Sequence, residues 1–517
     1  MASHPTTLFV GRHTSHGAEL VQGSAQRGGD RLVTFRSDWK PDRSSVVPLY
    51  RQIINHLREK ITSGEWPVGS RIPSQRVLAK AMGVNRSTVV TAIDELIAEG
   101  WIEGKTGSGT VVVDNSWRTV SALPPDWNQY VSSGLYRPNL PTIQEINQAE
   151  FLPGMIRLGT GELSPELYPY EMMADILGRL PERIHSLGYE EPKGLLFLRE
   201  QISRYVASFG IRATPDSILV VSGALQALQL ISLGILQQGA TALLERPSYL
   251  YSLHLFQSAG IRLVGVPLDS QGIAVDRLAA DIKKQNASLL YTIPSFHNPT
   301  GLVMSEERRS DVLQICEAER LPIVEDDVYR ELWIDQPVPA PLKARDRSGL
   351  VLYLGSLSKS LSPGLRIGWL IGPEPVMERL ADIKMQTDYG SSSLSQWAAA
   401  EWLATGFYQQ HLESIRSQLR RRREIVLQAL QRCFSDLAEW TEPQGGFYIW
   451  MRLIPPVRMR DLFDKARAAG ILLNPGSLYD RHATDHLRLS YAYAKESELT
   501  EAIHTLSVLI RQQRSSQ

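Results

Sequence analysis

The clearest hydrophobic pattern in the first part of the chain is helical. Apolar side chains fall on every fourth position from residue 49 to residue 61, which predicts one buried face of a helix that Gly64 ends. Ser74 precedes a second helical stretch, residues 75–82, and is expected to cap it. Asn85 is expected to cap a third helix, so the pattern predicts three helices in succession.

The residues that follow alternate in polarity around Gly107, as a β-hairpin would over residues 101–113. Two short helices joined by a glycine-containing turn and followed by a hairpin predict a winged helix-turn-helix over residues 46–114. Residues 1–45, rich in Ser, Gly, His and Arg without a sustained period, are interpreted as a mobile arm. Residues 115–150 carry four prolines and no long period, which favours a semi-rigid linker.

Beyond residue 150, short apolar runs alternate with helical stretches, the pattern of a mostly parallel sheet with crossover helices. Toward the C-terminus the order changes to strand, helix, strand and helix, which predicts a smaller α+β lobe. The fold class is therefore α/β, with the winged helix-turn-helix ahead of a large domain over residues 151–517. The expected strands of the main sheet are Ile218–Val221, Thr241–Leu244, Leu289–Ile293, Pro322–Glu325 and Val351–Leu354.

The composition is that of an ordinary globular protein. Of 517 residues, 43% are hydrophobic and 21% charged, which excludes global disorder. No apolar run approaches the ~18 residues of a spanning helix and no signal peptide is evident, so we expect a cytoplasmic protein without membrane contact. Two cysteines are too few for a disulfide framework or a cysteine-based zinc site, and no metal is expected.

Charge constrains the mode of nucleic-acid binding. Lys+Arg and Asp+Glu both number 55, so the bulk field of the molecule cannot attract a polyanion, although a local surface still can. In the third helix, Arg86, Ser87 and Thr88 form the first turn, which is the part of a recognition helix that reaches base edges. Further candidates for contact with double-stranded DNA are Arg71, Arg76 and, at the wing, Lys105. The alternative is that the three helices and the hairpin form a small packing module that does not bind DNA.

Five motifs occur in order along this region, namely Pro48–Ile53, Pro73–Arg76, Val84–Val89, Glu99–Ile102 and Gly107–Thr110. Together they resemble the GntR-type winged helix of bacterial repressors. The resemblance implies that a dimer reads operator half-sites, with DNA contacts at Arg71, Ser74, Arg76, Arg86, Ser87, Thr88 and the wing around Gly107. A separate run, Arg420–Arg423, lies in a helical pattern and is interpreted as part of a solvated helix in preference to a second DNA site.

A lysine in a loop beyond a predicted strand introduces a second kind of chemistry. Ligands of α/β sheets bind beyond the carboxyl ends of strands, where hydroxyl, amine and guanidinium groups gather in this chain. A lysine that is desolvated beside an arginine loses its proton more easily, and a neutral amine is what Schiff-base chemistry requires. The residues of this loop are Ser356, Ser358, Lys359 and Arg366.

Other residues supply the parts that a pyridine aldehyde phosphate needs. Asp326 ends a predicted strand, where its carboxylate can hold the ring nitrogen protonated. Asn298 and Tyr329 can hydrogen-bond the phenolic oxygen of the ring, and Tyr249 offers a flat face for stacking. Each residue also has an ordinary interpretation as a turn or core position, so the combination is what indicates the cofactor.

An earlier strand leads into a turn and a helix at Ser222, Gly223 and Ala224, where N–H groups and a glycine suit a phosphate. Together these features resemble the fold-type I pyridoxal-phosphate enzymes of the aspartate aminotransferase class, over roughly residues 155–515. The cofactor that the resemblance implies is pyridoxal 5'-phosphate.

The resemblance also implies a role for each candidate residue. Lys359 forms the internal aldimine, Asp326 pairs with the pyridine nitrogen, and Tyr329 with Asn298 holds the ring oxygen. Tyr189 reaches the phosphate of the neighbouring subunit, and Arg488 clamps the α-carboxylate of an amino acid with a bidentate fork. One departure is Leu225, where the family commonly has glutamine. The phosphate is held by Ser222, Gly223, Ala224, Ser356, Ser358 and Arg366.

A GntR-like head joined to an aminotransferase-like body resembles the MocR/GabR family of bacterial regulators. The leading hypothesis is a transcription regulator that senses an amino acid, amine or vitamer through Lys359 and changes how a homodimer engages DNA, with domain swapping of that dimer left open. The rival is an active aminotransferase with a fused DNA-binding head, because Lys359, Asp326, Tyr249 and Arg488 are all present. A third hypothesis makes the cofactor itself the effector.

Overall fold

The structure is a computed structural model in which the chain divides into two compact units, residues 1–132 and 133–517. Each unit is described by itself. Residues 1–38, in the range predicted as a mobile arm, and Gly107 lie outside the described residues. The structure describes residues 39–105, 109–113, 127–134, 136, 138–186, 188–454 and 457–515.

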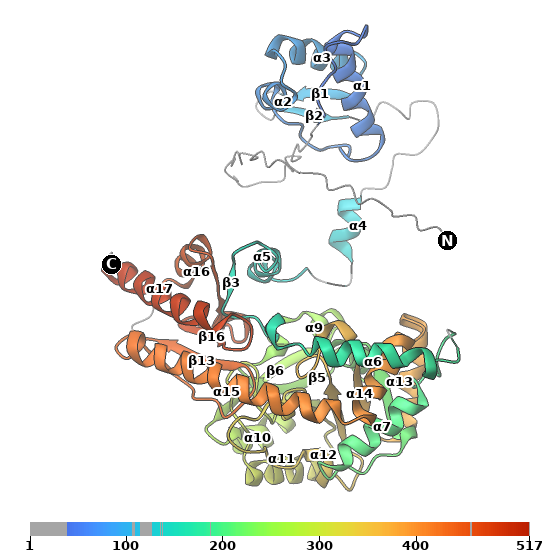
Figure 1. The fold of residues 1–517 in the computed structure, drawn as a ribbon, viewed down its shortest axis with the longest axis vertical. Helices are drawn as coiled ribbons and strands as arrows, with labels where there is room; N and C mark the ends of the chain where they lie inside the picture. Colours follow the sequence, from blue (N-terminus) through green and yellow to red (C-terminus); the bar gives the residue numbers. More distant parts are fainter. Residues whose placement is uncertain are drawn as a thin grey trace, which may run out of the picture. The chain divides into compact units, whose positions relative to one another are not determined.

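The first unit is the predicted winged helix-turn-helix (Figure 1). Ser74 caps its second helix, since its hydroxyl accepts a hydrogen bond from the Val77 N–H at 3.4 Å, and Gly83 ends that helix at a φ of 66°. Asn85 occupies the cap position of the third helix, although its side chain makes no capping hydrogen bond. The elements are α1 (Leu49–Thr62), α2 (Gln75–Met82), α3 (Arg86–Ala98), β1 (Ile102–Lys105) and β2 (Gly109–Val112).

Part of the predicted arm is packed against this unit. The Trp39 ring stacks on His56 of α1 at 4.0 Å between centroids. The Asp42 N–H donates to the Gln52 side chain at 2.9 Å, and Arg43 donates to the Gly83 carbonyl at 3.0 Å. These contacts depend on single side chains instead of a hydrophobic period, so the sequence pattern could not show them.

Two helices lie in the range predicted as a linker, α4 (Trp127–Ser133) and α5 (Pro141–Ala149). In α5, Ile146 and Ala149 are buried in the main hydrophobic cluster of the second unit. The linker prediction is therefore wrong for α5, which belongs to the core of the large unit. A helix of nine residues with two buried positions is too short to give a detectable period.

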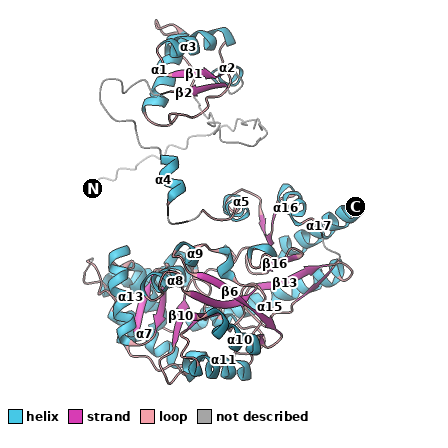
Figure 2. Ribbon diagram, turned by 180° about the vertical axis from the view of Figure 1, so that it is seen from behind, coloured by secondary structure: helices cyan, strands magenta, loops and turns pink. Residues whose placement is uncertain are grey.

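The second unit is built on an eight-stranded sheet of order β4-β11-β10-β9-β8-β5-β6-β7 (Figure 2). From β10 to β6 the neighbouring strands run parallel, whereas β11 is antiparallel to both β4 and β10, and β7 to β6. The prediction of a mainly parallel sheet is confirmed. The strands are β4 (Ile218–Val221), β5 (Thr241–Arg246), β6 (Arg262–Asp269), β7 (Gly272–Ile273), β8 (Ala287–Thr292), β9 (Ile323–Asp326), β10 (Val351–Ser356) and β11 (Gly368–Ile371).

Helices cover both faces of this sheet. Successive strand residues point to opposite faces, so Ile218 and Val220 of β4 join one hydrophobic cluster and Leu219 and Val221 another. The first cluster includes residues of α6, α7 and α14, and the second includes residues of α8 and α13. The helices are α6 (Tyr170–Arg183), α7 (Leu196–Ala207), α8 (Ala224–Gly234), α9 (Leu255–Ser258), α10 (Val275–Gln285), α11 (Glu306–Ala318), α12 (Leu342–Arg345), α13 (Glu374–Thr387) and α14 (Ser393–Ala404).

The smaller α+β lobe is also confirmed. Its antiparallel sheet has the order β12-β13-β16-β15, and a two-stranded parallel pair joins β14 to β3. The long α15 lies beside α17 (Figure 1). The elements are β3 (Ile156–Arg157), α15 (Phe407–Phe434), β12 (Ala438–Trp440), β13 (Tyr448–Leu453), α16 (Met459–Ala468), β14 (Ile471–Leu472), β15 (Asn474–Pro475), β16 (His486–Ser490) and α17 (Glu496–Ser515).

The arginine run lies in a helix, α15, as predicted, and Arg420 and Arg421 are exposed. The interpretation as a solvated helix is wrong for Arg422 and Arg423, which hold neighbouring segments together. Arg422 is 2% exposed and donates to the Ala494 carbonyl at 2.5 Å. Arg423 pairs with Asp335, and Arg421 with Glu496 at 2.9 Å. Because successive helix residues point in different directions, adjacent arginines reach different partners.

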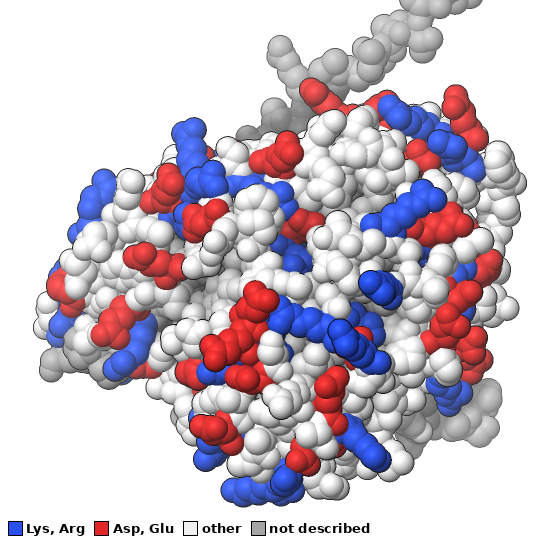
Figure 3. Space-filling model, turned by 90° about the horizontal axis from the view of Figure 1, so that it is seen from below, with Lys and Arg blue, Asp and Glu red and all other residues white. Residues whose placement is uncertain are grey.

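The large unit has no single-sign surface on the face seen in Figure 3, where basic and acidic side chains are interspersed. Among the described helices, none is both long and apolar enough to cross a membrane. In the same part of the chain, no group of three or more His, Cys, Asp and Glu side chains is arranged to hold a metal ion.

Candidate functional site

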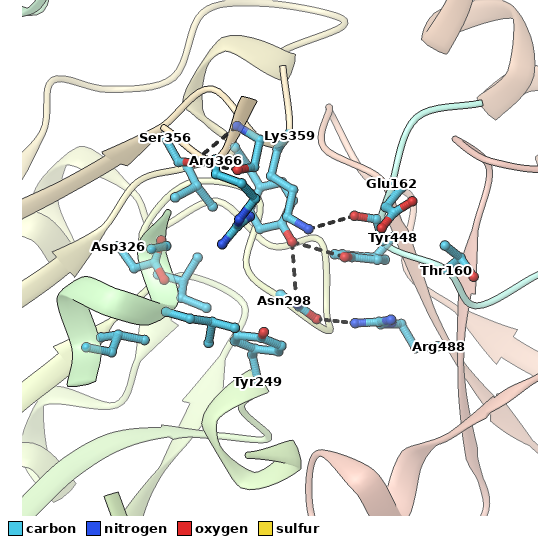
Figure 4. Close-up of a pocket in the computed structure, with 18 of the residues that line it drawn as sticks. Thr160, Glu162, Tyr249, Asn298, Asp326, Ser356, Lys359, Arg366, Tyr448 and Arg488 are labelled. Atoms are coloured by element: carbon cyan, nitrogen blue, oxygen red, sulfur yellow. Dashed lines mark hydrogen bonds between the residues drawn. The ribbon is translucent and has the colours of Figure 1, made fainter. Parts of the chain in front are cut away.

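A cavity of about 250 Å³ opens at the carboxyl ends of β4, β9 and β10 (Figure 4). This is the edge at which α/β sheets bind ligands. The structure brings ten of the predicted cofactor and carboxylate-binding residues to its wall. They are Ala224, Tyr249, Asn298, Asp326, Tyr329, Ser356, Ser358, Lys359, Arg366 and Arg488.

Lys359 follows β10 and extends into the cavity. Its Nζ donates a hydrogen bond to the Gly161 carbonyl at 2.7 Å. Gly161 has no side chain, and a Cβ atom there would lie 2.2 Å from the Tyr448 hydroxyl. Glycine therefore allows this loop to approach the lysine and the tyrosine closely.

Asp326 is the last residue of β9 and is 4% exposed. Tyr291 of β8 donates a hydrogen bond to Asp326 Oδ2 at 2.7 Å, whereas Oδ1 has no hydrogen-bond partner among the described residues. Burial raises the pKa of the Asp326 carboxyl to about 6, against a lowering by the Tyr291 hydrogen bond. An orphaned buried carboxylate oxygen indicates a site prepared for a cationic or protonated group.

Polar side chains from both lobes form a network on the other side of the cavity. Arg488 of β16 donates to Asn298 Oδ1 at 2.8 Å and to the Gly159 carbonyl at 2.6 Å. Asn298 Nδ2 lies 3.4 Å from the Tyr329 hydroxyl, which is 3.0 Å from the Tyr448 hydroxyl. Arg488 is 6% exposed and its Nε has no partner in the described part of the chain. The network fixes the position of the Arg488 guanidinium and leaves one of its N–H groups available to a ligand.

The turn between β4 and α8 forms a cradle. Gly223 has a φ of 93°, and a Cβ atom there would lie 2.6 Å from Arg366 Nη2. Arg366 Nη2 donates to the Ser222 carbonyl at 2.7 Å. Ala224 starts α8, so free N–H groups and a guanidinium meet at one place, which suits an anion such as a phosphate.

Three predicted residues do not line the cavity. Ser222 and Gly223 are absent from the cavity wall, and the Ser222 hydroxyl is 3.0 Å from the Ser391 hydroxyl. Tyr189 is 82% exposed, and its ring meets that of Tyr389 at 4.7 Å between centroids.

The predicted DNA-contacting residues lie at the start of α3 and around it. Arg86, Ser87, Ser74 and Arg76 are exposed, which leaves their polar groups open to a ligand. Arg86 Nη2 is 3.5 Å from Gln75 Oε1. Arg71, Thr88 and Lys105 lie beside β2, in the first turn of α3 and at the end of β1, respectively.

Two families match the chain. Residues 155–506 match the aminotransferase class I and II family, and residues 49–112 match the bacterial regulatory proteins of the gntR family. The chain belongs to the MocR/GabR-type regulators. The chain is 53% identical over 467 residues to the HTH-type transcriptional regulator YdfD of Bacillus subtilis, covering 90% of this chain and 97% of that protein. It is 32% identical over 447 residues to the HTH-type transcriptional regulator NorG of Staphylococcus aureus, covering 85% of this chain and 99% of that protein.

Several enzymes of known structure share the fold of the large unit. The MocR/GabR-type chain is similar to a kynurenine aminotransferase of Pyrococcus horikoshii, with a TM-score of 0.71, 30% identity and coverage of 75% of this chain and 98% of that one. LysN, an α-aminoadipate aminotransferase of Thermus thermophilus, matches with a TM-score of 0.70 and 30% identity over 76% of this chain and 100% of that one. That structure holds N-(5'-phosphopyridoxyl)-L-leucine.

Reasoning from the sequence missed several residues of the site. Tyr448 and Tyr291 lie in strands and have the appearance of ordinary core residues, so no pattern distinguishes them. Glu150, at the end of the range predicted as a linker, and Thr160 and Glu162, at the start of the large domain, also line the cavity. The succession Gly159-Thr-Gly161-Glu162, two glycines in a polar loop after a short strand, is the signal that could have found them.

Proposed function

We propose that this MocR/GabR-type regulator holds pyridoxal 5'-phosphate in the cavity and controls transcription in response to a ligand that carries an amino group. The observation that carries the proposal is the meeting of Lys359, Asp326 and Arg488 in one cavity of a chain that also has a gntR-type head. An amine, a buried carboxylate and a guanidinium are the groups that an amino acid and this cofactor together require.

The residues present fit the cofactor. The orphaned Oδ1 of Asp326 suits the protonated ring nitrogen, and the cradle of Gly223 and Arg366 suits the phosphate because a Cβ atom would fill it. Asn298 and Tyr329 would hold the ring oxygen, and Tyr249 would stack on the ring. When bound, the cofactor supplies an aldehyde that reacts with amines and a ring that withdraws electrons.

The residues of the chain then have distinct tasks. Asp326 keeps a proton on the ring nitrogen, and Tyr291 holds that carboxylate in place by a hydrogen bond of 2.7 Å. Arg488 binds the carboxylate of an amino acid, using the Nε that has no partner among the described residues. Lys359 Nζ would hold the cofactor through its aldehyde, the group that also reacts with the amine of a ligand.

DNA binding falls to the first unit in this proposal. Arg86, Ser87 and Thr88 in the first turn of α3 would contact base edges and phosphates, with Arg71 and Lys105 at the wing. The interspersed charges on the face of the large unit in Figure 3 give that face no basic patch for DNA.

A homodimer completes the proposal. Tyr189 is 82% exposed and does not line the cavity of its own chain, which supports a role toward the phosphate of a second copy. Arrangement as a domain-swapped pair is a variant of this proposal.

The proposal is tested by titrating the cofactor-loaded protein with amino acids while recording its absorbance and its affinity for the DNA upstream of its own gene. A responding ligand should change both. Lys359→Ala should abolish covalent trapping of the cofactor by borohydride, and trapping retained in that variant would overturn the assignment of the lysine. Equal affinity for upstream and random DNA would count against specific regulation.

The same experiment distinguishes regulation from the rival function, transamination. Its support is that Lys359, Asp326 and Arg488, the three groups that the reaction requires, line one cavity. Many turnovers of amino acid in the presence of a keto-acid acceptor would show an enzyme, whereas a single stoichiometric spectral change would show a sensor.

A further inference from the structure

We propose that the cavity selects an amino acid with a second cationic group on its side chain, such as ornithine or lysine, and that Glu150 and Glu162 recognise this group. The inference rests on the proposed function, because it names the ligand class of the same site. It comes from the charges that remain in the cavity once the cofactor has been accounted for.

The lining contains three basic and three acidic side chains. The cofactor would engage Arg366 through its phosphate, Asp326 through its ring nitrogen and Lys359 through its aldehyde. One cation, Arg488, and two anions, Glu150 and Glu162, are then left to face the ligand. The complementary ligand has one carboxylate and two amino groups. Its α-amino group would replace Lys359 on the cofactor aldehyde and release the lysine as a neutral amine.

Glu162 has no cation to neutralise it. It directly follows Gly161, whose carbonyl accepts the hydrogen bond from Lys359, and it lies on the same side of the drawn cavity as Thr160 and Arg488 (Figure 4). Within the described part of the chain, its carboxylate has neither an ion pair nor a hydrogen bond. A carboxylate that faces a ligand cavity without a partner favours a cationic ligand.

Glu150 is held toward the same cavity by a hydrogen bond. The Thr160 hydroxyl, in a residue 5% exposed, donates to Glu150 Oε1 at 2.7 Å. No described basic side chain lies within ion-pair distance of Glu150. Glu150 is also the cap residue at the end of α5, so the helix that the sequence pattern concealed forms part of the binding wall.

Glu150 and Glu162 also disfavour ligands with apolar or acidic side chains. An apolar side chain would leave both carboxylates unpaired once water is excluded, and the second carboxylate of glutamate would face two like charges. The electrostatics of the pocket thus discriminate by charge between side chains of the same length.

The test compares side chains of similar size and different charge. The cofactor-loaded full chain is titrated with L-ornithine, L-lysine, L-norleucine and L-glutamate, with the absorbance change as the readout. We expect the basic amino acids to bind at least about tenfold more tightly than norleucine and glutamate to bind most weakly, since a charged hydrogen bond is worth about tenfold or more in affinity. Norleucine or glutamate binding as tightly as lysine would overturn the proposal.

Two variants and a matched control test whether Glu150 and Glu162 cause the preference for basic amino acids. Glu162→Gln and Glu150→Gln should each weaken ornithine binding about tenfold. Neither should weaken norleucine binding, because a neutral amide is less costly than a carboxylate to leave unpaired beside an apolar side chain. Glu171→Gln, an exposed position outside the cavity in the first turn of α6, should change neither. Equal weakening of ornithine and norleucine would show a merely structural role. If no amino acid alters the absorbance, the proposed function fails; if amino acids respond without preference for a basic side chain, only this inference fails.

Discussion

Replacement of Asp326 by asparagine should stabilise the protein without cofactor and weaken its hold on the cofactor. Asp326 is 4% exposed, and burial raises its pKa to about 6 from an ordinary 3.8. A folded-state pKa above the unfolded one means that ionisation opposes folding, so stability is lost as the pH rises from about 4 through 6. A difference of about two pH units corresponds to about 3 kcal/mol, which the asparagine side chain avoids.

The assay is thermal unfolding of the cofactor-free chain at two pH values. At pH 8 the whole penalty of about 3 kcal/mol is present, whereas at pH 5 the wild-type carboxyl is largely protonated when folded and roughly half of the penalty remains. The stabilisation by Asp326→Asn should therefore be larger at pH 8 than at pH 5. The Tyr291 hydroxyl can still donate to the amide oxygen, so packing is preserved.

In the cofactor-loaded protein, Asp326→Asn has the opposite effect and is unfavourable. Loss of a charged hydrogen bond to the ring nitrogen costs about 1.5–3 kcal/mol, which lowers cofactor affinity by roughly 10- to 150-fold in an absorbance titration. The neighbouring Asp327 is the control: it is 3% exposed and pairs with Arg330, so Asp327→Asn should destabilise the protein. An Asp326→Asn protein that is less stable without cofactor, or equally affected at both pH values, would refute the assignment of a penalised buried carboxylate.

Three other substitutions separate the cradle, the DNA surface and the core. Gly223→Ala places a Cβ atom 2.6 Å from Arg366 Nη2 at a φ of 93°, and should reduce cofactor affinity at least about tenfold by absorbance titration, whereas Gly178→Ala, with nothing within 4 Å, should not. Arg86→Ala should weaken specific DNA binding by about 1–3 kcal/mol in fluorescence anisotropy and leave the cofactor absorbance unchanged; unchanged affinity would remove this residue from the interface. Leu57→Ala, at a position 1% exposed, should destabilise the first unit by about 2–5 kcal/mol in calorimetry, and a loss below 1 kcal/mol would contradict its place in the core.

Local signals in the sequence were sufficient to predict helices of the first unit and the strand at the edge of the main sheet. The helix predicted over residues 75–82 occupies those residues, because a serine cap and a terminal glycine mark its two ends. The predicted strand 218–221 is likewise β4. Buried strands with apolar runs and clear terminators carry their boundaries in the sequence.

Features that depend on distant partners escaped prediction. Strand β11 lies antiparallel between β4 and β10, and nothing in its four residues indicates that position. The interpretation of Arg420–Arg423 as a solvated helix failed at Arg422, because the burial of this residue depends on a carbonyl more than 70 residues away. Tyr291 escaped for the same reason, since its role arises from its register beside β9.

The cavity wall connects ligand chemistry to the segment that leads back to the DNA-binding unit. Glu150 ends α5, and α5 is fastened to the small lobe by Glu145, which accepts hydrogen bonds from Arg460 at 2.9 Å and Arg467 at 3.3 Å. A ligand alters DNA binding only by the difference in its affinity for two arrangements of the chain, and a tenfold change needs about 1.4 kcal/mol. One charged contact to Glu150 that forms in a single arrangement is of that size. A basic ligand that reaches Glu150 could therefore switch the regulator, whereas a ligand bound only by Arg488 and the cofactor would leave α5 untouched.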